Sequence, residues 1–243
     1  MNSDTADGRA PGGDNPIGER ERRVMNSRGR ELLLRHWDFP LFASLLRRHG
    51  ISLENRAILD AGCGSGYSLT LIRERFRPSR LVGFDILPAQ VELARRRNVP
   101  ATVFAGDISA LQLASESFDA VFVCGVLHHC RTWRAGLAEV ARVLKDGGVL
   151  LLEEPDAPFL RFERTLTGHS PALDAGFSLE ALRHEMKRDG LAVVEQRALY
   201  FGLFGSFLCV KAATATGAEY VLARHVLRAP SESEFPAGQQ APA

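Results

Sequence analysis

The residues best suited to chemistry lie in the middle of the chain, where three short apolar runs each end in a carboxylate. The first run leads into the segment 58–67, ILDAGCGSGY, in which Asp60 precedes the alternate glycines Gly62, Gly64 and Gly66. Glycines at this spacing let the backbone turn sharply and approach a ligand with no Cβ in the way. A helix that begins just after them presents N–H groups and the positive end of its dipole. The turn predicts a ligand site, with a tight structural turn as the alternative.

The other two carboxylates have the chemistry of nucleoside recognition. Asp85 ends the second run, nineteen residues after Gly66, where a carboxylate can accept hydrogen bonds from both hydroxyls of a ribose. Asp107 follows Gly106 at the end of the third run, where it can accept from an exocyclic amine. Either carboxylate alone could be a cap or a solvated loop residue. Together, at successive strand ends, they favour one nucleoside-like ligand.

Two common nucleotide motifs do not match this segment. Tyr67 stands where a nicotinamide-type fingerprint has its third glycine, and the Gly-Lys-Ser/Thr of a phosphate loop is missing. An enzyme that uses NAD is therefore only a minor alternative.

The elements that must position these residues alternate along the chain. Apolar runs predict strands at 57–61, 81–85, 101–105, 118–124, 149–152, 191–199 and 206–212. Amphipathic spacing predicts helices at 19–50, with a break or kink at Pro40, and at 65–76, 88–98, 131–144, 177–190 and 218–228. Alternating strands and helices predict an α/β fold, with a mainly parallel sheet covered by helices on both faces. Ligands of such sheets bind at the carboxyl ends of the strands.

Composition limits the class of protein. The chain has 243 residues, of which 45% are hydrophobic and 24% are charged, so it can form a core. It contains no run of about 18 apolar residues, so no membrane span is expected. The net charge of +1 provides no strong field for nucleic acid. The four cysteines, Cys63, Cys124, Cys130 and Cys209, lie in or beside apolar segments, which predicts reduced thiols and a cytoplasmic protein.

The two ends of the chain differ in composition from its middle. Residues 1–18 are rich in Gly, Asp and Pro, and residues 229–243 in Pro, Ser and Gln, so both are predicted to be disordered tails. Residues 1–18 also lack the apolar core of a signal peptide. The predicted domain spans 19–213, with an N-terminal helical cap at 19–50, and a C-terminal helix follows at 214–228.

At these motifs the sequence resembles the class I S-adenosylmethionine-dependent methyltransferases. It is most similar to the type 11 group, which includes ubiquinone/menaquinone C-methyltransferases and many natural-product methyltransferases. The matching motifs are ILDAGCGSG, GFDI, Gly106-Asp107-Ile108, SFDAVFVCGVLHH and VLKDGGVLLL, which together cover about residues 57–152. The resemblance implies a Rossmann-like, seven-stranded sheet with a reversed last strand, an N-terminal helical lid and S-adenosyl-L-methionine as cofactor.

The resemblance also implies roles for single residues. Gly62, Cys63 and Gly64 would line the methionine part of the cofactor, and Asp60 would orient its amino group. Asp85 would bind the ribose and Ile86 would flank the adenine, whose edge would meet Asp107 and Ile108 after Gly106. Cys124 and Gly125 would lie near the sulfonium, where the group often has Asn or Ser.

Because the sulfonium already activates the methyl group, the protein must mainly align the reactants and exclude water. A hydroxyl or acidic carbon acceptor would also have to lose a proton. His128 and His129 are the candidates for this step, with helix capping or packing as the alternative. Glu153 and Glu154 are further candidates. No metal is expected, because the adjacent ligands His128, His129 and Cys130 cannot easily face one ion.

The segments expected to cover the acceptor are rich in aromatic residues. They carry Trp37, Phe39, Phe42, Phe159, Phe162, Tyr200, Phe201 and Phe204. These side chains predict a small apolar or aromatic acceptor, with packing of the cap onto the sheet as the alternative. The function predicted is methyl transfer to an oxygen or carbon atom of a small metabolite, and a homodimer is compatible with it. The alternatives are an RNA or protein methyltransferase and a non-catalytic S-adenosylmethionine-binding regulator.

Overall fold

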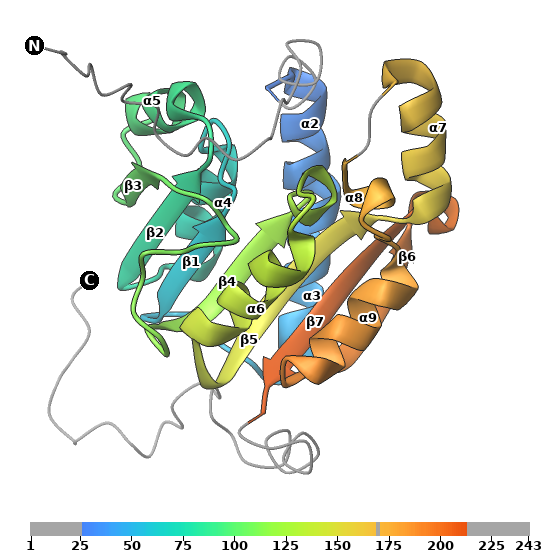
Figure 1. Cartoon of the computed structure of the whole chain (residues 1–243). Helices are drawn as coiled ribbons and strands as arrows, with labels where there is room; N and C mark the ends of the chain where they lie inside the picture. Colours follow the sequence, from blue (N-terminus) through green and yellow to red (C-terminus); the bar gives the residue numbers. More distant parts are fainter. Residues whose placement is uncertain (1–25, 169–170, 213–243) are drawn as a thin grey trace, which may run out of the picture.

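The computed structural model describes residues 26–168 and 171–212. They form one seven-stranded sheet in the order β3-β2-β1-β4-β5-β7-β6 (Figure 1). The strands are β1 Ala57–Ala61, β2 Arg80–Asp85, β3 Thr102–Ala105, β4 Phe118–Cys124, β5 Leu144–Pro155, β6 Leu191–Leu199 and β7 Phe204–Lys211. The pairs from β3 to β5 are parallel, and β7 runs antiparallel to both β5 and β6. The predicted Rossmann-like sheet with a reversed last strand is confirmed.

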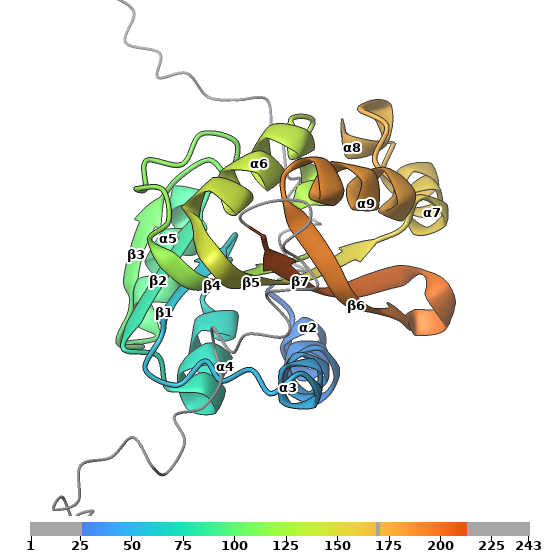
Figure 2. The same ribbon diagram turned by 90° about the horizontal axis from the view of Figure 1, so that it is seen from below.

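Helices cover both faces of this sheet. They are α2 Arg28–Leu33, η1 Leu34–Asp38, α3 Phe39–Arg48, α4 Tyr67–Phe76, α5 Pro88–Arg96, η2 Leu127–His129, α6 Trp133–Val143, α7 Ala157–Thr167, α8 Pro171–Asp174, α9 Leu179–Arg188 and η3 Tyr200–Gly202. Figure 2 shows α3 and α4 on one face of the sheet and α6 and α9 on the other. Two apolar layers result, one on each side of the sheet.

Aromatic side chains fill both layers. On the α3 face, the ring of Phe39 stacks on Phe122 with centroids 5.7 Å apart, and Phe42 meets Phe122 edge to face at 5.8 Å. On the opposite face, Trp133 and Phe177 form an edge-to-face pair at 5.2 Å. Phe39 and Phe42 are fully buried. These two aromatics, predicted as candidates for the acceptor site, therefore serve to pack the cap onto the sheet.

The N-terminal helix changes from α to π geometry directly before Pro40, the residue at which a break or kink is predicted. Residues Leu34–Asp38 form a π-helical turn, in which the N–H of Phe39 bonds to the carbonyl of Leu34. Pro40 then occupies the first turn of α3, where a missing N–H costs little. The wider turn removes the clash that proline causes inside an α-helix. Residues 19–25 of the predicted helix lie outside the described residues.

The fifth strand is much longer than predicted. The sequence places it at 149–152, after a helix that ends at Leu144, but the helix ends at Val143 and β5 continues from Leu144 to Pro155. Its register against β4 shifts between Phe118 and Ala120. This irregularity accommodates Lys145-Asp146-Gly147-Gly148, the four residues that follow the predicted helix 131–144. As a result, Glu153 and Glu154 lie inside a strand and point to opposite faces of the sheet.

The domain boundaries stay predictions. The predicted C-terminal helix at 214–228 and the tails at 1–18 and 229–243 lie outside the described residues. Among the helices that are described, none is both long and apolar enough to cross a bilayer.

Candidate functional site

A pocket opens at the carboxyl ends of the central strands. It encloses about 440 Å³ of atom-free space, part of it open solvent, and is lined by Gly62, Phe84, Asp85, Ile86, Gly106, Asp107, Ile108, Gly125, Val126, His129 and Cys130. Seven of the predicted cofactor residues and His129 are brought together here. Asp60, Cys63, Gly64, Cys124 and His128 are not in the lining.

Three residues of the pocket lining are not among the site residues predicted from the sequence. Phe84 is in the GFDI motif, and Val126 and Cys130 flank the two histidines. Their apolar character gave them the appearance of core residues, and only their position at strand ends could have marked them.

The glycine-rich loop is held by its own amides. The N–H groups of Gly62 and Cys63 both donate to the carbonyl of Phe84, at 2.9 and 2.8 Å, and Gly66 donates to the carbonyl of Cys63 at 2.9 Å. The N–H of Gly64 donates to the carboxylate of Asp85 at 2.9 Å. These amides shape the loop instead of pointing at a ligand. The loop can therefore offer a ligand close approach of its backbone more than hydrogen-bond donors, in agreement with the role expected of its glycines.

Gly62 and Gly64 provide a matched pair of substitutions. Both have positive φ, +78° and +52°, but a Cβ on Gly62 would lie 2.5 Å from Val126, whereas one on Gly64 would meet no atom within 4 Å. Gly62→Ala is expected to lower the free energy of unfolding by about 2–3 kcal/mol, from strain plus overlap. Gly64→Ala should cost about 1 kcal/mol, from strain alone. Urea unfolding of both variants checks this, and equal losses would contradict the close contact.

Asp85 ties two segments of the pocket together. Its Oδ2 accepts the Gly64 N–H at 2.9 Å, and its Oδ1 accepts the Leu87 N–H at 2.9 Å. Burial raises the pKa of Asp85, while the bonds from Leu87 and Gly64 and the nearby His129 oppose that shift. Each carboxylate oxygen can accept a second hydrogen bond. Asp85 can therefore hold the loop and bind a diol at the same time.

Asp107 and Ile108 form the end of the pocket beside β3. Asp107 Oδ1 accepts the N–H and the hydroxyl of Ser109, both at 2.8 Å, which shapes the turn after the strand. Ile108 is buried and lies near Gly136 of α6. The arrangement places a carboxylate beside an apolar wall, which suits a flat heterocycle with a polar edge.

Asp60, Cys63 and Cys124 support the pocket from behind. Asp60 Oδ2 accepts the Ser68 hydroxyl at 2.5 Å, and burial raises the pKa of Asp60 to about 7. The Cys63 side chain is buried towards Gly83, and burial raises the pKa of its thiol. Burial also raises the pKa of the Cys124 thiol well above its usual value. Neutral thiols in such places act as small apolar side chains.

The two histidines have different surroundings. His128 is buried, and its Nδ1 lies 2.7 Å from Glu154 Oε2. Glu154 also accepts the backbone N–H groups of Val126 and Leu127 at 2.8 Å and of His128 at 3.3 Å. His129 packs its ring against His128, with centroids 3.8 Å apart, and lines the pocket. Glu154 therefore fixes the turn after β4.

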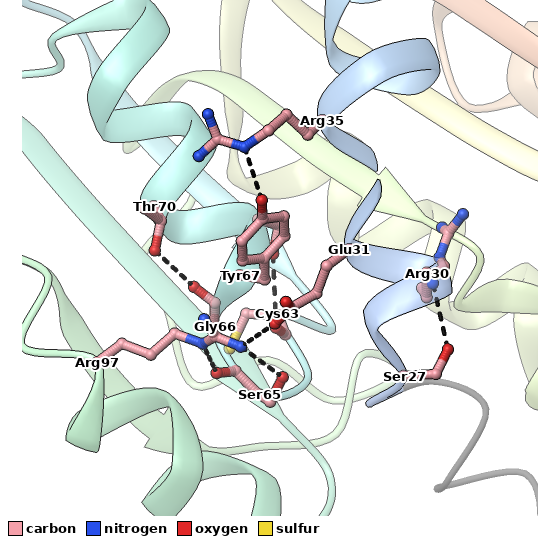
Figure 3. Close-up of polar contacts among 11 residues, drawn as sticks. Ser27, Arg30, Glu31, Arg35, Cys63, Ser65, Gly66, Tyr67, Thr70 and Arg97 are labelled. Atoms are coloured by element: carbon pink, nitrogen blue, oxygen red, sulfur yellow. Dashed lines mark hydrogen bonds and ion pairs between the residues drawn. The ribbon is translucent and has the colours of Figure 1, made fainter. Parts of the chain in front are cut away.

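Hydrogen bonds and an ion pair hold the N-terminal helix against the glycine-rich loop (Figure 3). Arg97, at the end of α5, donates to the Ser65 carbonyl at 2.7 Å and pairs with Glu31 of α2 at 2.5 Å. Arg35 of η1 donates to the Tyr67 hydroxyl at 2.7 Å. These contacts hold α2 beside the loop, which agrees with the expected N-terminal cap. Sequence alone did not reveal them because each joins residues that are at least 32 positions apart.

Comparison with known proteins shows what the central part of the chain is similar to. Residues 59–152 match the family model described as a methyltransferase domain. A malonyl-[acyl-carrier protein] O-methyltransferase of Serratia marcescens is 31% identical over 147 residues, covering 56% of this chain and 57% of the relative. The chain spans about half the length of the curated relatives it matches.

Solved structures share the fold. One chain of the Haloferax volcanii complex between the Trm112 methyltransferase activator and a methyltransferase aligns with a TM-score of 0.63 at 22% identity, covering 79% of this chain and 98% of that one. Geranyl diphosphate C-methyltransferase from Streptomyces coelicolor, solved with Mg²⁺, geranyl diphosphate and S-adenosyl-L-homocysteine, aligns at 0.59 and 14% identity, covering 71% and 79%. At identities below 25%, these TM-scores show a shared fold and nothing more.

Proposed function

We propose that the chain is a class I S-adenosylmethionine-dependent methyltransferase of type 11, because residues 59–152 match the methyltransferase-domain family model and relatives and solved structures of methyltransferases resemble it. It transfers a methyl group from S-adenosylmethionine to an oxygen or carbon atom of a small, apolar acceptor. The observation that carries the proposal is the pocket at the strand ends, in which Asp85 and Asp107 flank the apolar side chains of Phe84, Ile86 and Ile108.

The residues of the pocket fit this cofactor. Asp85 keeps acceptor capacity for the two ribose hydroxyls, and Asp107 stands at the opposite side of the apolar wall that would face adenine. At the loop, the open space beside Gly64 leaves room for the methionine part, with Asp60 behind it. When bound, S-adenosylmethionine supplies a methyl group already activated by its sulfonium.

The chain's own residues then have to orient the acceptor and exclude water. Gly125 and Val126 border the pocket at the end of β4, and Glu154 fixes the turn that carries them. His128 belongs to the same arrangement through its bond to Glu154. We therefore assign His128 a positioning role, and His129 a place at the pocket wall.

Replacement of His128 tests this assignment. His128→Ala should slow turnover about fivefold, because the turn after β4 loosens, while the affinity for S-adenosylhomocysteine stays within about twofold. The measurement is a rate profile over pH together with calorimetric binding. A profile that loses its pH dependence in the variant would instead make His128 the base.

The rim of the site supports an apolar acceptor. Nine large apolar side chains are exposed among the described residues, and seven of them lie on α2, η1, α7 and η3 or directly after it: Leu32, Leu33, Trp37, Phe162, Leu166, Phe201 and Leu203. Figure 1 shows α2 and α7 extending past the carboxyl ends of the strands. Exposed apolar side chains on elements at this edge of the sheet are available to pack against an apolar ligand. The relative from Serratia marcescens is named as an O-methyltransferase of malonyl-[acyl-carrier protein].

A substitution on α7 tests the rim. Phe162 is 63% exposed, so Phe162→Ser should leave stability nearly unchanged and raise KM for an apolar acceptor about fivefold. Leu93→Ser is the matched control, because Leu93 is exposed on α5, which packs on β2 and β3 at the edge of the sheet far from α7 (Figure 1). Equal KM values in both variants would remove the rim from acceptor binding.

The experiment for the proposed function uses methyl-labelled S-adenosylmethionine with a panel of long-chain alcohols, fatty acids and phenols. Label in an extracted product, lost in Asp85→Ala, is the expected result. A chain that binds the cofactor and labels neither this panel nor a metabolite extract would point to the non-catalytic regulator. The free state of all four cysteines supports a reducing, cytoplasmic location. The homodimer stays a prediction, which a molar mass measured by light scattering would test.

A further inference from the structure

A cluster of buried ionisable groups lies beside the pocket, at the carboxyl end of β5. Arg30 of α2 places its Nη1 3.1 Å from Asp38 Oδ2 and 3.7 Å from Glu153 Oε1. The hydroxyl of Tyr200 donates to Asp38 Oδ1 at 3.0 Å. The side chains of Asp38 and Glu153 are 0% and 1% exposed, whereas that of Arg30 is 24% exposed. Four elements far apart in the sequence thus converge on one spot.

Glu153 is unusual within this cluster. Neither of its carboxylate oxygens accepts a hydrogen bond from an N–H or O–H group of the described residues, and the buried hydroxyl of Ser206 also has no partner among them. Ser206 lies directly across from Glu153 in the β5–β7 pair. Buried polar atoms are almost always paired. Glu153 interacts chiefly with Arg30 and Asp38, so the oxygens of Glu153 and Ser206 can each accept a hydrogen bond from a group outside the chain.

The cluster borders the expected sulfonium end of the pocket. The backbone carbonyl of Glu153 accepts the N–H of Gly125 at 2.8 Å, and Gly125 lines the pocket. A Cβ on Gly125 would lie 3.8 Å from Arg30 Nη2. Cys124 is the register partner of Glu153 in the β4–β5 pair, and the carboxylates of Asp60 and Glu153 both raise the pKa of its thiol. The cluster and the cofactor loop are thus neighbours.

The charges around Glu153 do not balance. Burial, the carboxylates of Asp38 and Glu154 and a side-chain hydrogen bond shared with Asp38 raise the pKa of Glu153 well above the usual value, and only Arg30 opposes them. Tyr200 and Cys124 are the other titratable groups that sense Glu153, and burial raises the pKa of both, so they stay neutral. One guanidinium therefore faces two carboxyl groups of the cluster. A further positive charge placed nearby would favour the ionised form of Glu153.

We propose that Glu153 is the proton acceptor of the reaction, that the positive charge of the bound cofactor holds it ionised, and that the acceptor is a neutral hydroxyl. This inference rests on the proposed function. As the methyl carbon bonds to the acceptor oxygen and leaves sulfur, the electron pair of the C–S bond stays on sulfur and the hydroxyl proton passes to Glu153. The sulfur becomes a neutral thioether, so the protonated form of Glu153 is then favoured. Asp38, Arg30 and Tyr200 act as positioning residues.

The same charges argue against a carboxylate acceptor. A carboxylate would bring a third negative group to a single guanidinium that already contacts Asp38 and Glu153. A hydroxyl brings no charge, and it carries the proton that Glu153 can take. Arg30 is the most exposed member of the trio, so its 3.7 Å contact with Glu153 is the one that an entering hydroxyl would replace.

The first test needs no acceptor. Binding of S-adenosylmethionine and of S-adenosylhomocysteine is measured by titration calorimetry near pH 7, in two buffers that differ in ionisation enthalpy. The two ligands share their amino-acid part and differ in the charge at sulfur. We expect binding of S-adenosylmethionine to release at least about 0.5 proton more than binding of S-adenosylhomocysteine releases. Equal proton release for the two ligands would overturn the proposal.

Variants identify the group that releases the proton. Glu153→Gln should abolish the difference in proton release and reduce methylation of a hydroxyl acceptor at least about a hundredfold. Asp38→Asn removes a charge that raises the pKa of Glu153, so it should shift the proton release to lower pH. Glu180→Gln, at an exposed position of α9, is the matched control and should change neither. Unchanged proton release in Glu153→Gln would contradict the assignment.

Failure of this inference is distinguishable from failure of the proposed function. A wild-type chain that binds neither ligand contradicts the cofactor site itself. A chain that binds both, with equal proton release, keeps the cofactor site and loses only Glu153. If Glu153→Gln does not fold, the wild-type buffer comparison and Asp38→Asn still decide the question. Methylation of fatty acids in preference to long-chain alcohols would also overturn the choice of acceptor.

Discussion

Glu154→Ala is expected to lower the free energy of unfolding by about 3–5 kcal/mol. The carboxylate is fully buried and accepts three backbone N–H groups and the ring of His128. Removing it leaves those groups in the interior without an acceptor, and each carries its own desolvation cost. The loss should be measured by urea unfolding, with the transition followed by circular dichroism.

Two further variants separate hydrogen bonding from simple truncation. Glu154→Gln keeps one acceptor oxygen but turns an amide NH₂ towards the donors, so it should lose about 2–3 kcal/mol. Glu180→Ala, on the exposed surface of α9, should lose less than about 0.5 kcal/mol. If Glu154→Ala unfolds within about 1 kcal/mol of the wild type, the carboxylate does not hold the turn.

Asp85→Ala should weaken binding of S-adenosylhomocysteine about a hundredfold, because two charge-assisted hydrogen bonds to the ribose are lost. The same change should lower the free energy of unfolding by about 2 kcal/mol, since the amides of Gly64 and Leu87 lose their acceptor. Titration calorimetry gives the affinity, and urea unfolding gives the stability.

Asp119 supplies the control for that experiment. Its carboxylate accepts the Ala57 N–H at 2.8 Å and pairs with Lys145 at 2.9 Å, at the start of β1 and β4. Asp119→Ala should therefore destabilise the chain to a similar extent, about 1–2 kcal/mol, without changing cofactor affinity. If both aspartate variants bind the ligand equally well, Asp85 has no part in ribose binding.

The sequence could predict the frame of the site because local patterns determine it. Short apolar runs mark strands in a parallel sheet, and the order of the strands predicts that Asp85 and Asp107 lie at the same edge of the sheet. Both residues line the pocket at that edge. Ser178 has the residue type and the position of an N-cap for α9, and its side chain accepts the N–H of Ala181 at 3.1 Å. Such features need only neighbouring residues.

The adjacent pair Glu153 and Glu154 shows where local patterns stop. Both follow an apolar run, and placing the strand end at Leu152 made them look like equivalent loop residues. Since β5 continues to Pro155, strand alternation sends Glu154 to the turn that carries the histidines and Glu153 to Arg30 and Asp38. These partners come from distant parts of the chain. The π-helical turn before Pro40 depends likewise on packing against the sheet.

The central claim is that the loop at 60–66, with Asp85 and Asp107, forms a cradle for the adenosyl part of S-adenosylmethionine. The most direct measurement is a crystal structure of the wild-type chain grown with S-adenosylhomocysteine. We predict the ribose hydroxyls within hydrogen-bond distance of Asp85, the adenine edge at Asp107 and the methionine part against Gly64. A ligand seated elsewhere, or none at saturating concentration, would contradict the account.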